Sequence, residues 1–256
     1  MLDDVLQLLE RLAPPRLAAG WDNTGLLLEG DRPVRRILVT IDLTEPVCAE
    51  AVEHDVDLVV AYHPPIFRGL KSLTRADGIG RSLLTLARRG VHVYSPHTAL
   101  DAVPGGMNDW LLQAFPVRQA VPIEPDRDEP RAGVGRVATI EARPAEALLG
   151  SIRSHLGLTH LRVAGPLDRT VERVAVCPGS GGSVFSGLRD VDLLLTGEMS
   201  HHDVLAWVAR GTVVVLTEHT NTERGYLPQL AADLAAGVDG TQVRVATSDR
   251  DPLTVF

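Results

Sequence analysis

Short apolar runs alternate with helical stretches through the first half of the chain. Three runs rich in β-branched residues, at 35–43, 56–62 and 91–95, have the length and composition of buried strands. Two stretches with helical periodicity, near 46–54 and 79–89, separate them. Strands that alternate with helices in this way are typical of a mostly parallel sheet covered by helices. The pattern therefore predicts an α/β domain.

The same pattern returns after a polar, proline-containing stretch near residues 124–133. The second half has further predicted strands at 171–179, 191–198 and 212–218, and predicted helices near 184–189, 201–210 and 222–235. We therefore predict the α/β class, with two related domains and mostly parallel sheets. The polar stretch sets the expected boundary between a first domain at 1–125 and a second at 126–256. A C-terminal strand is compatible with either domain.

The two halves look like divergent copies of one unit. VDLVVAYHPP in the first half matches VDLLLTGEMSHH in the second, and GVHVYSPHTALD matches GTVVVLTEHTNTE. In both copies the last strand runs into a His-Thr pair, and a carboxylate follows four residues after the histidine. The pairs are His97 with Asp101 and His219 with Glu223. Ligands of open parallel sheets bind beyond the carboxyl ends of the strands, where both pairs fall.

A histidine and a carboxylate at this spacing can direct a nitrogen and an oxygen toward one point. Imidazole suits zinc, iron and similar ions, and carboxylates can bridge two divalent ions. A single pair is explained equally well as a surface histidine and a helix-capping acid. Two pairs at equivalent positions favour a metal site, so we predict two divalent metal ions in the cleft between the two domains.

Several other polar residues lie at predicted strand ends. His63 follows a strand, and the two prolines after it hold it at the strand tip. Glu198, His201 and His202 lie at the corresponding tip of the second half and are candidates for orienting the ligands. Ser200 resembles a helix N-cap, so an ordinary exposed first turn explains these three residues as well.

The glycine-rich turn at 179–183 and the two cysteines need no special chemistry. The turn lacks the lysine and hydroxyl ending of a nucleotide-triphosphate loop, and we interpret it as a tight turn. Cys48 and Cys177 are far apart in the sequence, in a helix-like and a strand-like segment. They indicate neither a disulfide nor a cysteine zinc site, and we expect both to be buried.

Charge and hydropathy limit the partners. The formal net charge of −8 argues against a large nucleic-acid surface, which requires a basic face. No apolar run approaches the roughly 20 residues of a transmembrane helix. The first residues, MLDDVLQLLERL, are acidic and amphipathic, unlike a signal sequence. We therefore expect a cytoplasmic protein that binds no membrane.

Five motifs together resemble a known family. WDNTGLLLEG, YHPPIF, HTALDAVPGGMND, LLTGEMSHHD and EHTNTE occur in the order of the Nif-three-like dinuclear metal-centre hexameric family, often labelled GTP cyclohydrolase 1 type 2 homologues. The resemblance covers most of the chain and implies two α/β domains, two metal ions and a homohexameric ring. It implies metal ligands at His63, Asp101, His219 and Glu223.

The chain departs from the family pattern at Tyr62, where many members have the first of two adjacent histidines. A missing imidazole weakens one ion position, unless water or His97 replaces it. Asp22 and Asn23 of the WDNTG motif are expected to fix a turn and to take no part in catalysis.

Two functional hypotheses remain open. The first is a metal-dependent hydrolase of a small nucleotide-like substrate, similar to GTP cyclohydrolase, in which His97 is the catalytic general acid or base. Its substrate is implied by the resemblance alone. The second is a non-enzymatic assembly that binds metal or acts as an adaptor. Loss of substrate conversion, but not of metal, on replacement of His97 would distinguish them.

Overall fold

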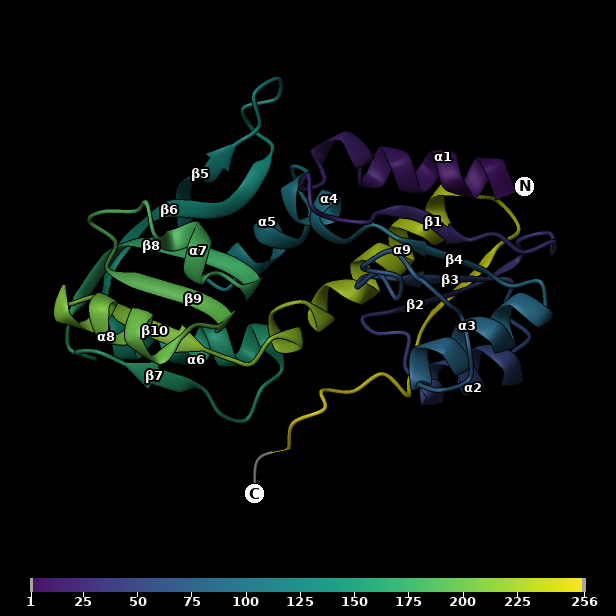
Figure 1. Cartoon of the computed structure of the whole chain (residues 1–256). Helices are drawn as coiled ribbons and strands as arrows, with labels where there is room; N and C mark the ends of the chain where they lie inside the picture. Colours follow the sequence, from purple (N-terminus) through teal and green to yellow (C-terminus); the bar gives the residue numbers. More distant parts are fainter. Residues whose placement is uncertain (1, 255–256) are drawn as a thin grey trace. The chain divides into compact units, whose positions relative to one another are not determined.

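The computed structural model describes residues 2–254 and divides into two compact units. Unit 1 comprises Met1–Leu100 and Tyr226–Phe256, and unit 2 comprises Asp101–Gly225 (Figure 1). The chain therefore leaves unit 1 after residue 100 and returns to it at residue 226. The boundary expected at 125/126 falls inside unit 2, in the loop of a hairpin.

Unit 1 is built on a five-stranded sheet in the order β1-β4-β3-β2-β11. Its strands are β1 (Gly25–Leu28), β2 (Arg36–Thr40), β3 (Leu58–Ala61), β4 (His92–Ser95) and β11 (Gln242–Val245). Only the β1–β4 pair is antiparallel. All residues of β3 and β4 are buried, as expected for central strands covered on both faces.

Helices cover both faces of this sheet. They are α1 (Leu2–Leu12), α2 (Glu45–Glu53), α3 (Gly78–Arg88) and α9 (Leu227–Gly237), with the 3-10 turn η1 (Pro15–Leu17) after α1. Figure 1 shows α1 and α9 on one side and α2 and α3 on the other. Helix α2 begins after Thr44, which accepts from the Val47 N–H, and α3 begins after Asp77, which accepts from the Gly80 N–H.

Unit 2 has a six-stranded sheet in the order β5-β6-β8-β9-β10-β7. The strands are β5 (Val117–Pro125), β6 (Gly133–Pro144), β7 (Arg162–Ala164), β8 (Thr170–Ser180), β9 (Leu193–Glu198) and β10 (Val213–Leu216). Strands β8, β9 and β10 are parallel, and the other pairs are antiparallel. The α/β class is confirmed, although this sheet is mixed rather than mostly parallel.

Two hydrophobic clusters flank the sheet of unit 2. One face packs against α5 (Met107–Leu112) and α6 (Ala145–Leu156), and the other packs against α7 (Gly182–Phe185) and α8 (His201–Ala209). The short helix α4 (His97–Ala102) leads from unit 1 into unit 2. The 3-10 turns η2 (Thr220–Thr222) and η3 (Arg224–Tyr226) lead back.

The internal repeat is confirmed by one pair of aspartates. Asp57 immediately precedes β3, and its Oδ2 accepts from two consecutive backbone N–H groups at the start of β2, both at 2.9 Å. Asp192 immediately precedes β9, and its Oδ2 accepts from two consecutive N–H groups of β8, at 3.0 and 2.9 Å. These aspartates are the matched residues of VDLVVAY and VDLLLTG, so the sequence match reflects the same local structure in both units.

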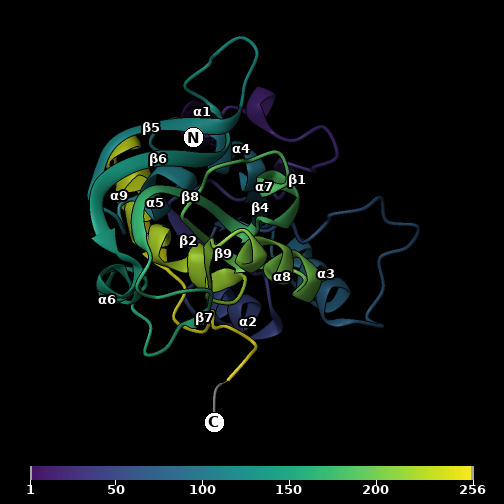
Figure 2. The ribbon, with the colours of Figure 1, turned by 90° about the vertical axis from the view of Figure 1, so that its left-hand side faces the viewer.

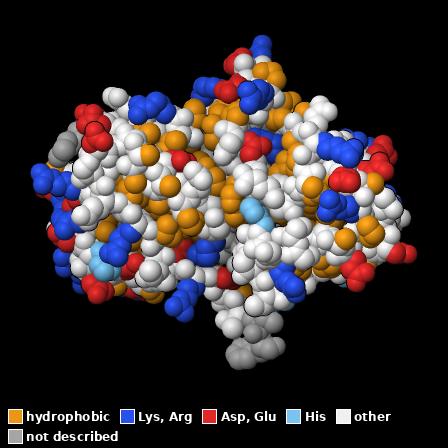
Figure 3. Space-filling view, turned by 180° about the vertical axis from the view of Figure 1, so that it is seen from behind, with side chains coloured by type: hydrophobic (Ala, Val, Ile, Leu, Met, Phe, Trp, Pro, Cys, Tyr) orange, Lys and Arg blue, Asp and Glu red, His pale blue; other side chains and the backbone are white. Residues whose placement is uncertain are grey.

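The surface has mixed charge. On the face displayed in Figure 3, basic and acidic side chains are interspersed among apolar ones. Within residues 2–254, no helix combines the length and hydropathy needed to span a bilayer.

Candidate metal centre

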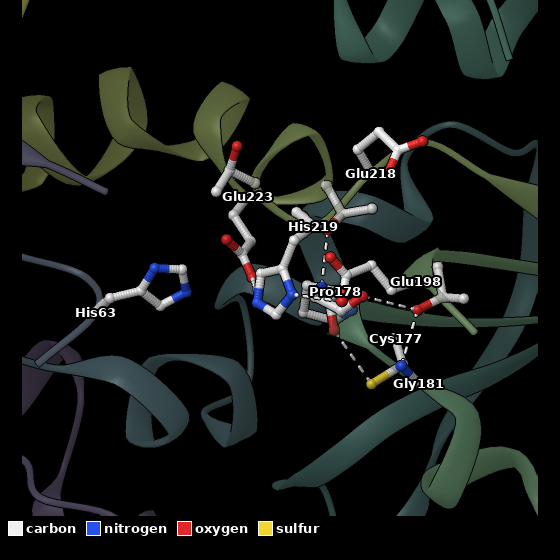
Figure 4. Close-up of polar contacts among 12 residues, drawn as sticks. His63, Cys177, Pro178, Gly181, Glu198, Glu218, His219 and Glu223 are labelled. Carbon is white, nitrogen blue, oxygen red and sulfur yellow. Dashed lines mark hydrogen bonds and ion pairs between the residues drawn. The ribbon is translucent and has the colours of Figure 1, made fainter. Parts of the chain in front are cut away.

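In unit 2, His219 and Glu223 follow β10 and flank the turn η2. His219 Nε2 lies 3.5 Å from Glu223 Oε1, a separation typical of two ligands of one ion (Figure 4). Glu223 is 2% exposed and His219 is partly exposed, so the pair joins a buried carboxylate to an accessible imidazole. Because an imidazole nitrogen and a carboxylate oxygen are both common metal ligands, the two residues could hold a metal ion.

Gly179, near the end of β8, keeps space at these two ligand atoms. A Cβ built on Gly179 would lie 2.8 Å from Glu223 Oε1 and 2.9 Å from His219 Nε2, closer than real contacts allow. Its φ of +61° is also one that side chains rarely adopt. Thr222 fixes this turn by accepting from the Gly179 N–H at 2.8 Å. The expected tight turn therefore leaves room for an ion beside the donors.

A second carboxylate orients the His219 ring. Glu198, the last residue of β9, places Oε2 3.4 Å from His219 Nδ1, and Figure 4 shows Glu198 and Glu223 on opposite sides of the ring. A carboxylate beside Nδ1 favours the proton on that nitrogen, so the lone pair of Nε2 faces Glu223. Glu198 thus has the orienting position considered from the sequence.

His201 and His202 begin α8 and are exposed. Ser200 is the N-cap of this helix, and it accepts from the Asp203 N–H at 3.2 Å. This agrees with the interpretation of this segment as an ordinary exposed first turn.

In unit 1, His63 is held in the same way. It follows β3, and its Nδ1 lies 2.9 Å from Oδ1 of Asp42, which follows the neighbouring strand β2. The hydrogen bond makes Nε2 the lone-pair side of the ring. The sequence did not single out Asp42, because its partner lies 21 residues away and no local motif connects them.

His97 is paired with a fully buried aspartate. Its Nδ1 lies 2.7 Å from Oδ1 of Asp22, whose side chain is 0% exposed. Asp22 also accepts from the backbone N–H groups of Asn23 at 2.7 Å and Thr98 at 3.1 Å. Burial alone would raise the pKa of Asp22, but the hydrogen bonds from His97 and Thr98 outweigh it and lower the pKa. Asp22 therefore does more than fix a turn.

The backbone has left-handed φ angles at both His-Thr turns. His97 has φ +29°, and Glu218, immediately before His219, has φ +67°. Such angles are unfavourable for residues with side chains and occur preferentially at functional sites. The strain at His97 therefore agrees with a functional role for this residue.

Tyr62 is buried and forms a cluster with two histidine rings of unit 1, which lie 5.5 Å apart. Its ring centroid lies 5.0 Å from that of His63 and 5.5 Å from that of His97. The phenol therefore packs beside both rings at the position where the family pattern has a histidine.

Asp101 lies on α4, four residues after His97, and is partly buried.

Both cysteines are buried. Burial raises the pKa of the Cys177 thiol, and the carboxylates of Asp101, Glu223 and Glu124 raise it further. Cys177 therefore stays protonated, in agreement with its expected role as a small buried residue. Cys48 is also a free, buried thiol.

Residues 1–252 match the Duf34/NIF3 (NGG1p interacting factor 3) family. The chain belongs to this family. It is 43% identical to the protein NIF3 homolog of Schizosaccharomyces pombe, over 98% of this chain and 96% of the relative. It is 30% identical to a Clostridium perfringens protein named GTP cyclohydrolase 1 type 2 homolog, over 98% of each chain.

A solved structure of a Bacillus cereus protein related to NIF3 has the same fold. Its TM-score is 0.90 at 18% identity, over 99% of this chain and 98% of that one. The family assignment confirms the resemblance drawn from the five sequence motifs.

Proposed function

We propose that this Duf34/NIF3 protein is a metal-dependent hydrolase that binds two divalent ions through His63, Asp101, His219 and Glu223. The observation that supports the proposal most strongly is the His219–Glu223 pair, with Gly179 keeping space at its donor atoms. The family resemblance adds His63, an imidazole that follows β3, to the proposed ligands. Zinc and iron suit such a mixture of imidazole and carboxylate ligands.

The three histidines share one arrangement that suits this role. Each has a carboxylate beside Nδ1, at 2.9 Å for His63, 2.7 Å for His97 and 3.4 Å for His219. This arrangement fixes the tautomer and presents Nε2 as the basic nitrogen. In His63 and His219 the basic nitrogen would serve as a metal ligand, whereas in His97 it would accept a proton from, or return one to, the substrate.

Divalent ions bound here would supply Lewis-acid chemistry and activate water for hydrolysis. His97 fits the role of general acid or base because the buried carboxylate of Asp22 holds its ring in one orientation. The name of the C. perfringens relative supports a nucleotide-like substrate. A GTP cyclohydrolase reaction is the specific form of the proposal.

One observation favours a second candidate function. The family description names an interacting factor, which agrees with a non-enzymatic adaptor or metal-binding assembly. The two candidates differ at His97. A hydrolase requires His97 for turnover. An adaptor shows no substrate conversion that depends on His97.

Elemental analysis of purified protein tests the metal site. In protein dialysed against excess metal we expect two ions per wild-type chain, the second held more weakly, and a loss of metal in His219→Ala, with the fold retained by circular dichroism. His160→Ala is the matched control, because His160 is an exposed histidine of the same unit. Full metal content in His219→Ala would remove this residue from the ligands.

A nucleotide screen of the metal-loaded protein then tests the reaction. We expect a nucleotide whose hydrolysis falls at least 100-fold in His97→Gln while the metal content stays unchanged. Turnover that is unaffected in His97→Gln would contradict the catalytic role of His97. The absence of any conversion in the wild type would favour the adaptor.

A further inference from the structure

Unit 1 contains a cavity of about 930 Å³ with His63 in its wall. The cavity is bounded by the ends of β2 and β3, the loop that joins β3 to α3, the start of α3, and Arg250 near the C-terminus. Figure 2 shows the β3–α3 loop extending outward from the unit beside α3. A cavity of this volume is large enough for a cofactor-sized or nucleotide-sized molecule.

Much of the cavity wall is apolar and exposed to solvent. Leu70, Leu73 and Ile79 line it and are 50%, 39% and 39% exposed. Pro64 and Pro65 add rigid apolar surface next to His63. These leucines and the isoleucine surround a concave surface. Covering them with an apolar group is favourable because it removes their contact with water.

The acidic side chains of the wall already have partners. Their contacts are Asp42 with His63 at 2.9 Å, Glu45 with Arg81 at 2.7 and 2.9 Å, and Asp77 with the N–H of Gly80 at 2.7 Å. Arg250 is the one arginine or lysine in the wall, and none of the ion pairs within residues 2–254 involves it. The guanidinium is therefore available to an anion, for which it has suitable donor geometry.

Buried carboxylates fix the segment that presents Arg250. Glu50, 7% exposed, accepts five hydrogen bonds from Thr247 and Ser248. Asp249, also 7% exposed, accepts at 2.7 Å from the backbone N–H that follows β2. The backbone next to Arg250 is thus ordered before any ligand arrives, which lowers the entropic cost of binding.

We propose that this cavity binds a small organic anion with an aromatic or apolar body. Its anionic group contacts Arg250, and its body covers Leu70 and Leu73. Because His63 forms part of the wall, the molecule would lie beside a proposed metal ligand, and in that respect the inference rests on the proposed function. It deepens that function by naming the class of substrate: an anion with an apolar face.

Two fluorescent probes that differ only in charge test the inference. 8-Anilinonaphthalene-1-sulfonate carries a sulfonate, and N-phenyl-1-naphthylamine is the same aromatic body without it. Both are titrated into the wild type, Arg250→Leu, Leu73→Asp and Arg88→Leu. The last variant is the matched control, because it makes the same change at an exposed arginine at the end of α3.

We expect Arg250→Leu to weaken binding of the sulfonate about tenfold and to leave the neutral probe unchanged, since a charge-assisted contact is lost. Leu73→Asp should weaken both probes, and Arg88→Leu neither. Equal affinities in the wild type and Arg250→Leu would overturn the inference. Loss of probe binding at the protein concentrations where sedimentation shows further self-association would also overturn the inference. The apolar wall would then be a contact between copies of the chain.

Metal separates this inference from the proposed function. The titrations are run on protein stripped with a chelator and on zinc-loaded protein, and we expect the Arg250 effect in both. A chain that takes up no zinc but shows the Arg250 effect would refute the metal site and retain the anion cavity. Zinc uptake without an Arg250 effect would retain the metal site and refute the anion cavity.

Discussion

The Nδ1 atom of His97 and the Oδ1 atom of Asp22 lie 2.7 Å apart, although 75 residues separate them in the sequence. The aspartate side chain is fully buried, so the hydrogen bond is shielded from solvent. This pair connects the WDNTG motif to the His-Thr turn of the first repeat. It also defines which nitrogen of His97 carries the proton.

Removing the carboxylate of Asp22 should change the tautomer of His97. We expect Asp22→Ala to shift the neutral ring from the Nδ1–H form toward the Nε2–H form, measured by long-range proton–nitrogen NMR correlation. The backbone N–H groups of Asn23 and Thr98 also lose their acceptor, so the free energy of unfolding should fall by about 2–4 kcal/mol. An unchanged tautomer would show that another group orients the ring.

Adding one methyl group at Gly179 should displace the two donors. We expect Gly179→Ala to lose metal because its Cβ would overlap Glu223 Oε1 and His219 Nε2. Gly157→Ala controls for backbone strain, since Gly157 has φ +67° with nothing within 4 Å of a built Cβ. Both variants should be destabilised by about 1 kcal/mol or more, whereas only Gly179→Ala should lose metal on elemental analysis.

Glu50 should make the free energy of unfolding depend on pH in the acidic range. Burial alone would raise its pKa, but hydrogen bonds from Ser248 and Thr247 lower it from 4.5 to about 2. Because the folded pKa is depressed, the stabilisation is complete above about pH 4.5 and is lost as the pH falls toward 2. Glu50→Gln should cost about 3 kcal/mol at pH 7 and less at pH 3. Urea unfolding at both pH values measures this.

Glu53→Gln is the control for Glu50, because Glu53 is an exposed glutamate of the same helix. It should change the free energy of unfolding by less than about 0.5 kcal/mol at either pH. A Glu50→Gln penalty of equal size at pH 7 and pH 3 would contradict the proposed linkage.

Tyr62→His should tighten the second metal ion. If the phenol leaves one ion position short of a nitrogen ligand, the wild type binds one ion tightly and the other more weakly. Titration of metal into stripped protein should show two separated binding steps in the wild type, and a stronger second step in the variant. Two equally tight ions in both proteins would mean that the other ligands already complete the site.

We expect the chain to form a homohexamer, as implied by its family resemblance and by the tendency of oligomers to close symmetrically. Sedimentation velocity at micromolar concentration measures the assembly. A stable monomer under these conditions would contradict the prediction.

The sequence predicted the repeated strands well, because each is a run of β-branched residues bounded by polar turns. It missed β5 because this strand is mostly exposed and lacks an apolar alternation, and it missed β6 because the charged Arg136 interrupts its buried stretch. The helix expected near 222–235 begins later, at Leu227, after two 3-10 turns. It belongs to unit 1, an assignment that depends on packing between distant segments.

The candidate ligands could be proposed from the sequence because each lies in one of the five motifs. The carboxylates that contact His97 and His63 were harder to predict, since Asp22 and Asp42 meet these histidines only through the order of the strands. Strand order depends on tertiary pairing, which a single sequence does not specify. Gly179 was recognised as a turn residue, but its close approach to His219 and Glu223 depends on how the end of β8 packs against the turn after β10.

The insertion of unit 2 into unit 1 has a consequence for the order of synthesis. β2 receives its neighbour β11, and Glu50 receives Thr247 and Ser248, only from a segment that follows unit 2 in the sequence. Until that segment leaves the ribosome, β2 is an open edge and a carboxylate destined for the interior lacks its donors. Unit 2, which is continuous in sequence, can form its whole sheet earlier. The segment of unit 1 that precedes unit 2 is therefore made before unit 2 but reaches its final structure after it.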